Sequence, residues 1–287
     1  MSYIISGKQM AEGICQEIKE KVGRLKRPPS LAVVLVGDRQ DSWTYVRAKQ
    51  RKCKELGITS ILKSFPEEVD NEEVLNAVNN LSNDKDIDGI LVQLPLPDHM
   101  DTCQILNAVD PKKDVDGFHL ENVGALVNGL NPICQPCTPK GIIRMLEIMD
   151  VKLQGKRVVI IGASRVVGIP LCHLFLQANA TPTLCHVYTE NIQSITKKAD
   201  ILVSACGQAQ MVKADWIKEG SIVIDVGINS IPDETRKSGK RLVGDIDFEG
   251  VKEKAKAITP VPGGVGPMTI AMLMENTYEI SRKMQTD

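Results

Sequence analysis

The segment from Lys156 to Pro170, which reads KRVVIIGASRVVGIP, constrains the fold more than any other part of the sequence. Its apolar run 158–161 is short and rich in β-branched residues, which predicts a strand buried on both faces. Gly162 ends this strand, and the apolar spacing over 166–177 predicts a helix that packs back onto it. A strand, a glycine turn and a helix N-terminus can hold an anion, because unpaired N–H groups and the helix dipole meet there.

The second half of the chain repeats this rhythm. Three further strands are predicted, at 183–186, 201–205 and 221–226. Helical patterns separate them, so the sequence predicts a doubly wound parallel sheet that binds a dinucleotide at its strand ends. Gly162 and Gly168 do not have the spacing G-x-G-x-x-G, and a turn without a ligand therefore remains the alternative.

The first half is also of the α/β class. Strands are predicted at 31–36, 58–65 and 88–94, and helices at 8–25, 42–57 and 71–81. The length of 287 residues corresponds to about two domains. We therefore expect a second α/β domain that is built separately from the nucleotide-binding one.

Composition limits the partners and the compartment. The net charge of −1 gives no basis for binding nucleic acid, and no apolar stretch suits a membrane span or a signal peptide. The eight cysteines are scattered, several within apolar elements, which indicates reduced thiols in the cytosol. Cys134 and Cys137 form one C-x-x-C pair without further ligands at zinc spacing, so we expect no metal.

Three polar side chains indicate proton chemistry in the first half. Tyr45 and Lys49 are four residues apart in a predicted helix, so they project from one face. Gln93 ends a predicted apolar strand, where an unpaired amide is costly to bury. An amide that orients Lys49, together with burial, would keep the pKa of the lysine low enough for acid–base catalysis. A solvated surface lysine is the alternative.

Three other segments are candidates for ligand contact or domain connection. Asp116 lies in the predicted turn 112–120, where it could bind paired N–H donors of a heterocycle or simply form an Asx turn. The loop 259–269, TPVPGGVGPMT, suits close backbone contact with a ligand, and a linker is its alternative. Thr138 is the expected N-cap of a helix over 140–149 that connects the domains.

Taken together, these segments resemble the bifunctional methylenetetrahydrofolate dehydrogenase/methenyltetrahydrofolate cyclohydrolases. The motifs of that family occur in order, as LVG and S-x-x-YV-x-x-K at 35–49, GILVQLPLP at 89–97, DVDGFH at 114–119, PCTP at 136–139, IDVGIN at 224–229, LVGDIDF at 242–248 and TPVPGGVGPMT at 259–269. GILVQLPLP and PVPGGVGPMT are each specific enough to identify the family.

The resemblance implies a small α/β catalytic domain beside a Rossmann-like domain, with the folate in the cleft between them. Residues 1–139, completed by a C-terminal helix at 268–287, would form the catalytic domain, and 140–267 the nucleotide-binding domain. It also implies a homodimer in the cytoplasm or an organelle, and since no transit peptide is visible we expect the cytoplasm.

The resemblance assigns roles to the polar residues already singled out. Lys49 would be the acid–base group, with Gln93 tuning it. Tyr45 would stack on the folate, and Asp116 would hold the pterin. Further substrate contacts are implied at Val92, Gln93, Leu94, Pro262, Gly263, Gly264, Val265 and Gly266, the last five of which would close over the substrate. Cofactor contacts are implied at Thr138, Gly162, Ala163, Ser164, Val187, Gly207 and Ile228.

The cofactor expected from the resemblance is NADP, but two positions depart from the family pattern. Ala163 stands where the family usually has the arginine of GRS, and Val187 where it often has the serine of CHS. These side chains are expected to bind the 2′-phosphate, so NAD is the alternative cofactor.

The resemblance implies two consecutive activities. The first is oxidation of 5,10-methylenetetrahydrofolate to the methenyl cation, and the second is hydrolysis of that cation to 10-formyltetrahydrofolate. Two alternatives remain open: a cyclohydrolase with an impaired nucleotide site, and a silent folate-binding subunit.

Overall fold

A parallel sheet organises the second half of the chain, as the segment 156–170 predicts. The sheet has six strands in the order β1-β11-β8-β7-β5-β6, and each neighbouring pair is parallel. Its strands are β1 (Tyr3–Ile4), β5 (Arg157–Ile161), β6 (Thr181–Cys185), β7 (Ile201–Ser204), β8 (Ile222–Asp225) and β11 (Ala257–Ile258). In β5, Val158 and Ile160 are buried on one face, and Val159 and Ile161 on the other. The prediction of a doubly buried strand is confirmed.

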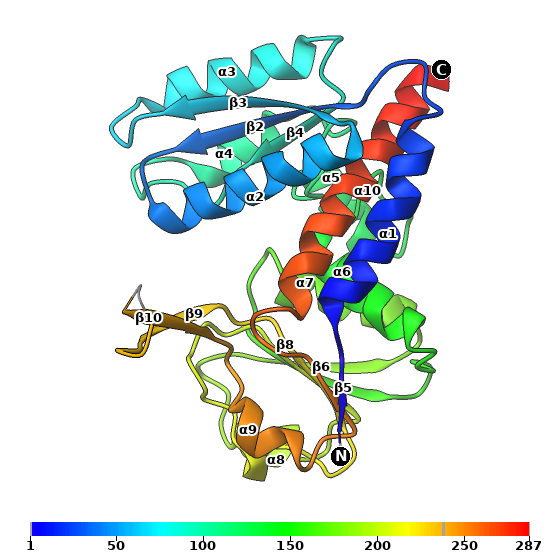
Figure 1. The fold of residues 1–287 in the computed structure, drawn as a ribbon, viewed down its shortest axis with the longest axis vertical. Coiled ribbons are helices and arrows are strands. Elements are labelled where there is room, and N and C mark those ends of the chain that lie inside the picture. The colour runs from blue at the N-terminus through cyan, green and yellow to red at the C-terminus, as the bar shows by residue number, and fades with distance from the viewer. Residues whose placement is uncertain (1, 237–238, 287) are drawn as a thin grey trace. The chain divides into compact units, whose positions relative to one another are not determined.

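The computed structural model describes residues 2–236 and 239–286, and its elements are labelled in Figure 1. These residues form two compact units, which we call unit 1 (2–11 and 138–269) and unit 2 (12–137 and 270–286). The resemblance instead implies that residues 1–11 belong to the same domain as the rest of 1–139. The pairing of β1 with β11 accounts for this difference. The predicted boundaries of the functional domains stay a prediction.

Unit 1 covers its sheet with short elements. These are α7 (Gly168–Gln177), α8 (Ile192–Thr196), the 3₁₀ helix η1 (Ala214–Trp216) and α9 (Phe248–Lys252). Side chains from α9 and from the chain around α8 and η1 form one buried cluster with Val159, Leu202 and Val223 of the sheet. A separate antiparallel hairpin, β9 (Asn229–Pro232) with β10 (Lys240–Val243), extends from the chain after β8, as Figure 1 shows.

Unit 2 contains a three-stranded parallel sheet in the order β3-β2-β4. The central strand is β2 (Ser30–Val36), flanked by β3 (Thr59–Phe65) and β4 (Gly89–Val92). Its helices are α2 (Gln40–Leu56), α3 (Asn71–Asn83), α4 (Thr102–Asn107) and α5 (Leu120–Val127). Every residue of β2 is buried, which matches the continuous apolar run of a parallel strand covered on both faces.

Three helices contain the points at which the chain passes between the units. They are α1 (Gly7–Val22), α6 (Cys137–Ile148) and α10 (Val265–Thr286). Within unit 2, α10 contacts α2 through Met274, whose sulfur lies 3.6 Å from that of Cys53. Within the described ranges, no helix has both the length and the apolarity that crossing a bilayer requires.

Helix boundaries in two predicted segments differ from the structure. α6 begins at Cys137, so Thr138 lies inside its first turn and is not the predicted N-cap of a helix starting at 140. Its hydroxyl lies 2.9 Å from that of Thr269. α10 begins at Val265, before the predicted start at 268, because Pro267 falls in the first turn, where a missing N–H costs nothing.

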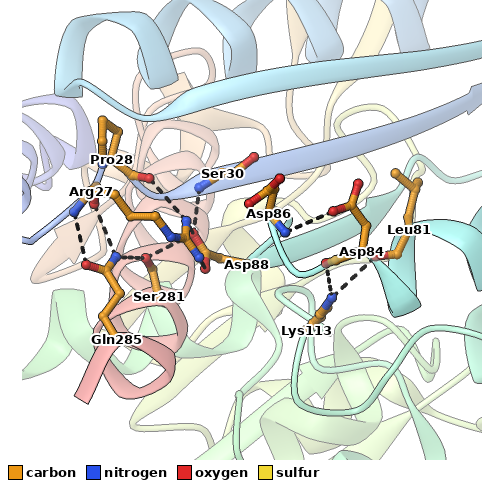
Figure 2. A network of polar contacts seen from close by, with 10 residues as sticks. All are labelled: Arg27, Pro28, Ser30, Leu81, Asp84, Asp86, Asp88, Lys113, Ser281 and Gln285. Carbon is orange, nitrogen blue, oxygen red and sulfur yellow. Dashed lines mark hydrogen bonds and ion pairs between the residues drawn. The ribbon is translucent and has the colours of Figure 1, made fainter. Parts of the chain in front are cut away.

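A buried carboxylate joins three segments of unit 2 (Figure 2). Asp88 lies just before β4 and is fully buried. Its oxygens accept two hydrogen bonds from the Arg27 guanidinium, at 2.6 and 2.8 Å, one from the Ser30 N–H at 2.8 Å and one from the Ser281 hydroxyl at 3.0 Å. This carboxylate therefore ties the start of β2 and the last part of α10 to the start of β4.

We expect Asp88→Ala to lower the free energy of unfolding by about 3 kcal/mol, because buried donors on Ser30 and Ser281 lose their acceptor. Urea denaturation measures this loss. Arg282→Ala is the control. It removes an exposed ion pair with Glu279 on α10, the helix that carries Ser281, and should cost at most about 0.5 kcal/mol. Equal losses in the two variants would show that the Asp88 network contributes no special stability.

Candidate functional site

Lys49 and Gln93 come together in unit 2, as the sequence predicts. Lys49 projects from α2, and its Nζ donates a hydrogen bond to Gln93 Oε1 at 3.0 Å. Gln93 follows β4 directly and is 8% exposed. Its N–H continues the strand ladder to Val34 O at 2.8 Å, and its Nε2 donates to Leu94 O at 2.7 Å. Both ends of the amide are therefore fixed, and the carbonyl oxygen is held toward the lysine.

Tyr45 lies one turn before Lys49 on α2. Its side chain is 38% exposed, so part of the phenol ring is free to contact a ligand. Burial of the remainder, together with the charge of Asp41, raises the pKa of the Tyr45 hydroxyl. The phenol therefore stays neutral near pH 7, as a stacking platform requires.

Asp116 completes the polar cluster of unit 2, and its neighbour Asp114 has a different function. The Asp114 carboxylate accepts the N–H groups of Gly117 at 2.9 Å and His119 at 2.8 Å, and the Asn122 side-chain amide at 2.9 Å. The turn-forming contacts considered for Asp116 thus belong to Asp114. The Asp116 carboxyl has a different partner, the Cys137 side chain.

The electrostatics of Asp116 connect it to Lys49. Burial raises the pKa of the Asp116 carboxyl, while the Lys49 charge favours its ionised form. The like charge of Asp114 raises this pKa further, and a hydrogen bond with Cys137 lowers it. Within the part of the chain that the structure describes, no group of three or more His, Cys, Asp or Glu side chains could hold a metal ion.

Asn276 supports the Asp116 turn from α10, and the sequence analysis missed it. Its Nδ2 donates to Val115 O at 2.9 Å and to Gln135 O at 3.1 Å. The available signal was a polar residue on the apolar stripe of the predicted last helix. Asn276 is 4% exposed, and a buried amide of this kind needs partners from other segments.

Two predicted substrate residues flank Gln93 with different exposure. Val92 is buried in the core cluster of the sheet, so only its main chain is available to a ligand. Leu94 is half-buried, and the peptide bond between it and Pro95 is cis.

The predicted loop 262–266 belongs to unit 1 and is only partly a loop. Val265 and Gly266 form the start of α10. The Lys8 N–H donates to Gly263 O at 3.0 Å, which fastens the loop to the start of α1. A Cβ on Gly264 would lie 2.5 Å from Pro260 O, so the tight turn requires glycine there.

The turn after β5 has the close approaches that the sequence suggested. Gly162 has φ +112°, and a Cβ there would lie 2.2 Å from Ala205 O. A Cβ on Gly168 would lie 1.8 Å from Gly162 O. The Ser164 hydroxyl accepts the Val167 N–H at 3.2 Å just before α7. Ala163 and Ser164 thus stand in a glycine-bounded turn at a helix N-terminus, which is the environment that a dinucleotide phosphate needs.

Three further predicted cofactor residues lie just after parallel strands of the same sheet. Val187, Gly207 and Ile228 follow β6, β7 and β8, and all three are exposed. Carboxyl ends of parallel strands lie at one edge of a sheet, so these residues share the edge at which open α/β sheets bind ligands. Thr138 does not follow a strand of this sheet, because it lies in the first turn of α6.

Asp225, the last residue of β8, is a buried carboxyl beside this edge. It accepts hydrogen bonds from the N–H groups of Gly227, Asp245 and Ile246, at 3.0, 2.9 and 2.9 Å. Desolvation nevertheless dominates and raises the pKa of Asp225 to about 7.

Comparison with known proteins matches both parts of the chain. Residues 5–116 match the catalytic domain of tetrahydrofolate dehydrogenase/cyclohydrolase, and residues 136–285 match its NAD(P)-binding domain. The chain is 50% identical over 281 residues to the bifunctional protein FolD of Wolbachia pipientis, covering 96% of this chain and 94% of that protein.

Two solved structures have the same fold. One is the FolD methylenetetrahydrofolate dehydrogenase/cyclohydrolase of Campylobacter jejuni, 45% identical, with a TM-score of 0.94 and 99% of each chain covered. The other is the Trypanosoma brucei methylenetetrahydrofolate dehydrogenase-cyclohydrolase complexed with NADP cofactor and inhibitor. It is 38% identical, with a TM-score of 0.95 and 98% of each chain covered.

The Asp225 carboxyl predicts a pH-dependent stability. Because the folded protein binds this proton more tightly than the unfolded chain, the stability from this group is complete below about pH 4 and is lost as pH rises through about 7. The loss over this window is at most about 4 kcal/mol. Urea unfolding of the wild type and of Asp225→Asn at several pH values measures it, and parallel pH profiles for the two proteins would contradict the assignment.

Proposed function

Because the chain belongs to the tetrahydrofolate dehydrogenase/cyclohydrolase family, we infer that it is a bifunctional one-carbon folate enzyme. It oxidises 5,10-methylenetetrahydrofolate to the methenyl cation with NADP and hydrolyses that cation to 10-formyltetrahydrofolate. The observation that carries the residue assignment is the 3.0 Å hydrogen bond from Lys49 Nζ to Gln93 Oε1. The charge of Lys49 also acts on the Asp116 carboxyl, which connects the three residues. The relatives give no support to a cyclohydrolase alone or to a silent subunit.

We propose that unit 2 binds the pterin through Asp116 and Tyr45. The two oxygens of the Asp116 carboxylate can accept two parallel hydrogen bonds from N–H groups of the aminopyrimidine edge. A water molecule has only one oxygen and cannot accept both in this geometry. The half-exposed ring of Tyr45 offers a stacking surface. Tyr45 lies on α2 and Asp116 lies in the turn before α5, both within unit 2. Contacts with both residues would limit the freedom of the bound folate, which supplies the positioning part of catalysis.

The oxidation requires little from the side chains beyond positioning. A bound nicotinamide supplies the acceptor for the hydride that leaves the methylene carbon. The glycine-bounded turn at 162–168 and the strand-end residues Gly207 and Ile228 would hold this nucleotide. Asp116 anchors the pterin so that the methylene carbon is held in one place. The product carries a positive charge shared by N5 and N10.

The hydrolysis depends on Lys49. Water adds to the methenyl carbon, and one of its protons passes to a base, the role for which Lys49 is positioned. The C–N5 bond then breaks as N5 receives a proton and the remaining O–H proton is released, which leaves the formyl group on N10. Gln93 Oε1 fixes the direction of the lysine, so that the same group can accept the first proton and return one to N5.

The remaining proposals concern assembly and compartment. A cytoplasmic homodimer is proposed from the family resemblance, and the reduced, largely buried cysteines suit a reducing compartment.

We expect Lys49→Met to reduce methenyl hydrolysis at least about 100-fold, since a positioned proton-transfer group contributes about that much or more. The measurement is the decay of methenyltetrahydrofolate absorbance. Lys52→Met on the same helix is the matched control, because Lys52 forms a solvent-exposed pair with Glu55. Normal hydrolysis by Lys49→Met would refute the role of this lysine.

Ala163→Arg should improve the use of NADP over NAD. A charge-assisted hydrogen bond to the 2′-phosphate contributes about 1.5–3 kcal/mol, so the ratio of kcat/KM for NADP over NAD should rise at least about tenfold. Parallel assays of methylenetetrahydrofolate oxidation with the two nucleotides give this ratio. Ala163→Leu adds bulk without charge and should leave the ratio unchanged. An equal gain in both variants would contradict a charge effect.

A further inference from the structure

We propose that Asp245 is a positioning residue that sets the two loops holding the nicotinamide nucleotide in unit 1. This inference rests on the proposed cofactor roles of Gly207 and Ile228. Asp245 itself is fully buried and has no surface for a ligand. It would therefore act through the main chain of those loops.

The side chain of Asp245 collects donors from two loops. Oδ2 accepts the N–H of Cys206 at 2.8 Å, the N–H of Gly207 at 3.2 Å and the Ser204 hydroxyl at 3.3 Å. Oδ1 accepts the side-chain amide of Asn229 at 2.9 Å. The first three donors belong to the end of β7 and the residues after it, and the fourth belongs to the chain after β8.

This arrangement requires a carboxylate. The N–H groups and the amide are all donors, and a carboxylate offers about four acceptor sites and no proton of its own. An asparagine of the same shape would direct an NH₂ group at one set of donors. That set would lose its acceptor inside a buried site, where an unsatisfied polar group is costly.

Asp245 also defines the space beside Ile228. A Cβ on Gly227 would lie 2.2 Å from Asp245 Oδ1, so the carboxylate packs directly against the main chain at 227. Ile228 follows and is 47% exposed. The carboxylate thus contacts the chain on both sides of Ile228, through Gly227 and through Asn229.

A second carboxyl holds Asp245 in position. The N–H of Asp245 donates to Asp225 Oδ1 at 2.9 Å, and its carbonyl accepts the Val212 N–H at 3.0 Å. The end of β8 therefore fixes the main chain of Asp245, and the side chain of Asp245 fixes the loops after β7 and β8. These are the loops whose exposed residues would contact the cofactor.

The decisive experiment compares Asp245→Asn with Asp200→Asn in the full-length protein. Asp200 lies just before β7, at the opposite end of the strand, where it accepts the Arg157 N–H at 3.0 Å and pairs with Lys218 at 2.6 Å. Each variant removes one carboxylate from unit 1. NADP binding by calorimetry, KM and kcat for NADP, KM for methylenetetrahydrofolate and nucleotide-independent methenyl hydrolysis are measured for both.

Asp245→Asn should raise the Kd and KM for NADP at least tenfold, with hydrolysis and the folate KM within twofold of wild type. Asp200→Asn should leave all five values within twofold. An unchanged NADP Kd in Asp245→Asn would overturn the inference, as would a parallel loss of hydrolysis, because that result indicates a general structural role.

A smaller change decides the case if Asp245→Asn does not fold. Asn229→Ala removes only the donor to Oδ1, so the NADP Kd should rise about threefold with normal hydrolysis, and an unchanged Kd would overturn the inference. Failure of the proposed function would look different, since the wild-type protein itself would then neither bind NADP nor oxidise methylenetetrahydrofolate.

Discussion

Burial of parallel strands on both faces is the constraint that the rest of this structure depends on. β2 and β5 are enclosed by apolar side chains, so their faces have no room for polar groups. Main-chain N–H groups become free for polar contacts where these strands end. Gln93 follows β4, and Asp225 ends β8. The amide that orients Lys49 and the carboxyl beside the proposed nucleotide edge both result from this restriction, whereas Lys49 itself comes from α2.

Buried acceptors perform the same task in both units. Asp88 in unit 2, and Asp225 and Asp245 in unit 1, each collect three or more donors, including some from segments distant in sequence. Asp114 in unit 2 collects three donors from the eight residues that follow it. A carboxylate is suited to this because it accepts several hydrogen bonds and donates none. The resulting loops are fixed at their bases, while the exposed residues beside them, such as Ile228, remain free to contact ligands. Rigidity of the base and exposure of the tip are what a binding loop requires.

The sequence was sufficient wherever a feature depends on neighbouring residues. The strand 157–161 follows from a local apolar run, and the pairing of Lys49 with Gln93 follows because an amide at a buried strand end must find a partner. The sequence was insufficient where the interacting residues are far apart along the chain. β1 has two residues, and its partner strand β11 lies more than 250 residues away, so no local pattern marks it. Asn276 and Asp245 were missed for the same reason, because their significance lies in donors or acceptors brought together only by the fold.

The difference between Asp114 and Asp116 shows why residue type alone does not assign a role. The two side chains are separated by one residue, and either could form the turn. Asp114 accepts hydrogen bonds on both oxygens, from two main-chain N–H groups and the amide of Asn122, so its carboxylate is committed to the turn. Asp116 lies where burial raises the pKa of its carboxyl and the Lys49 charge opposes that rise. In the proposed function, a bound heterocycle that donates two N–H groups would replace the lost water and favour the ionised form of this carboxyl. In the proposed site, ligand binding and the charge state of Asp116 would therefore be coupled.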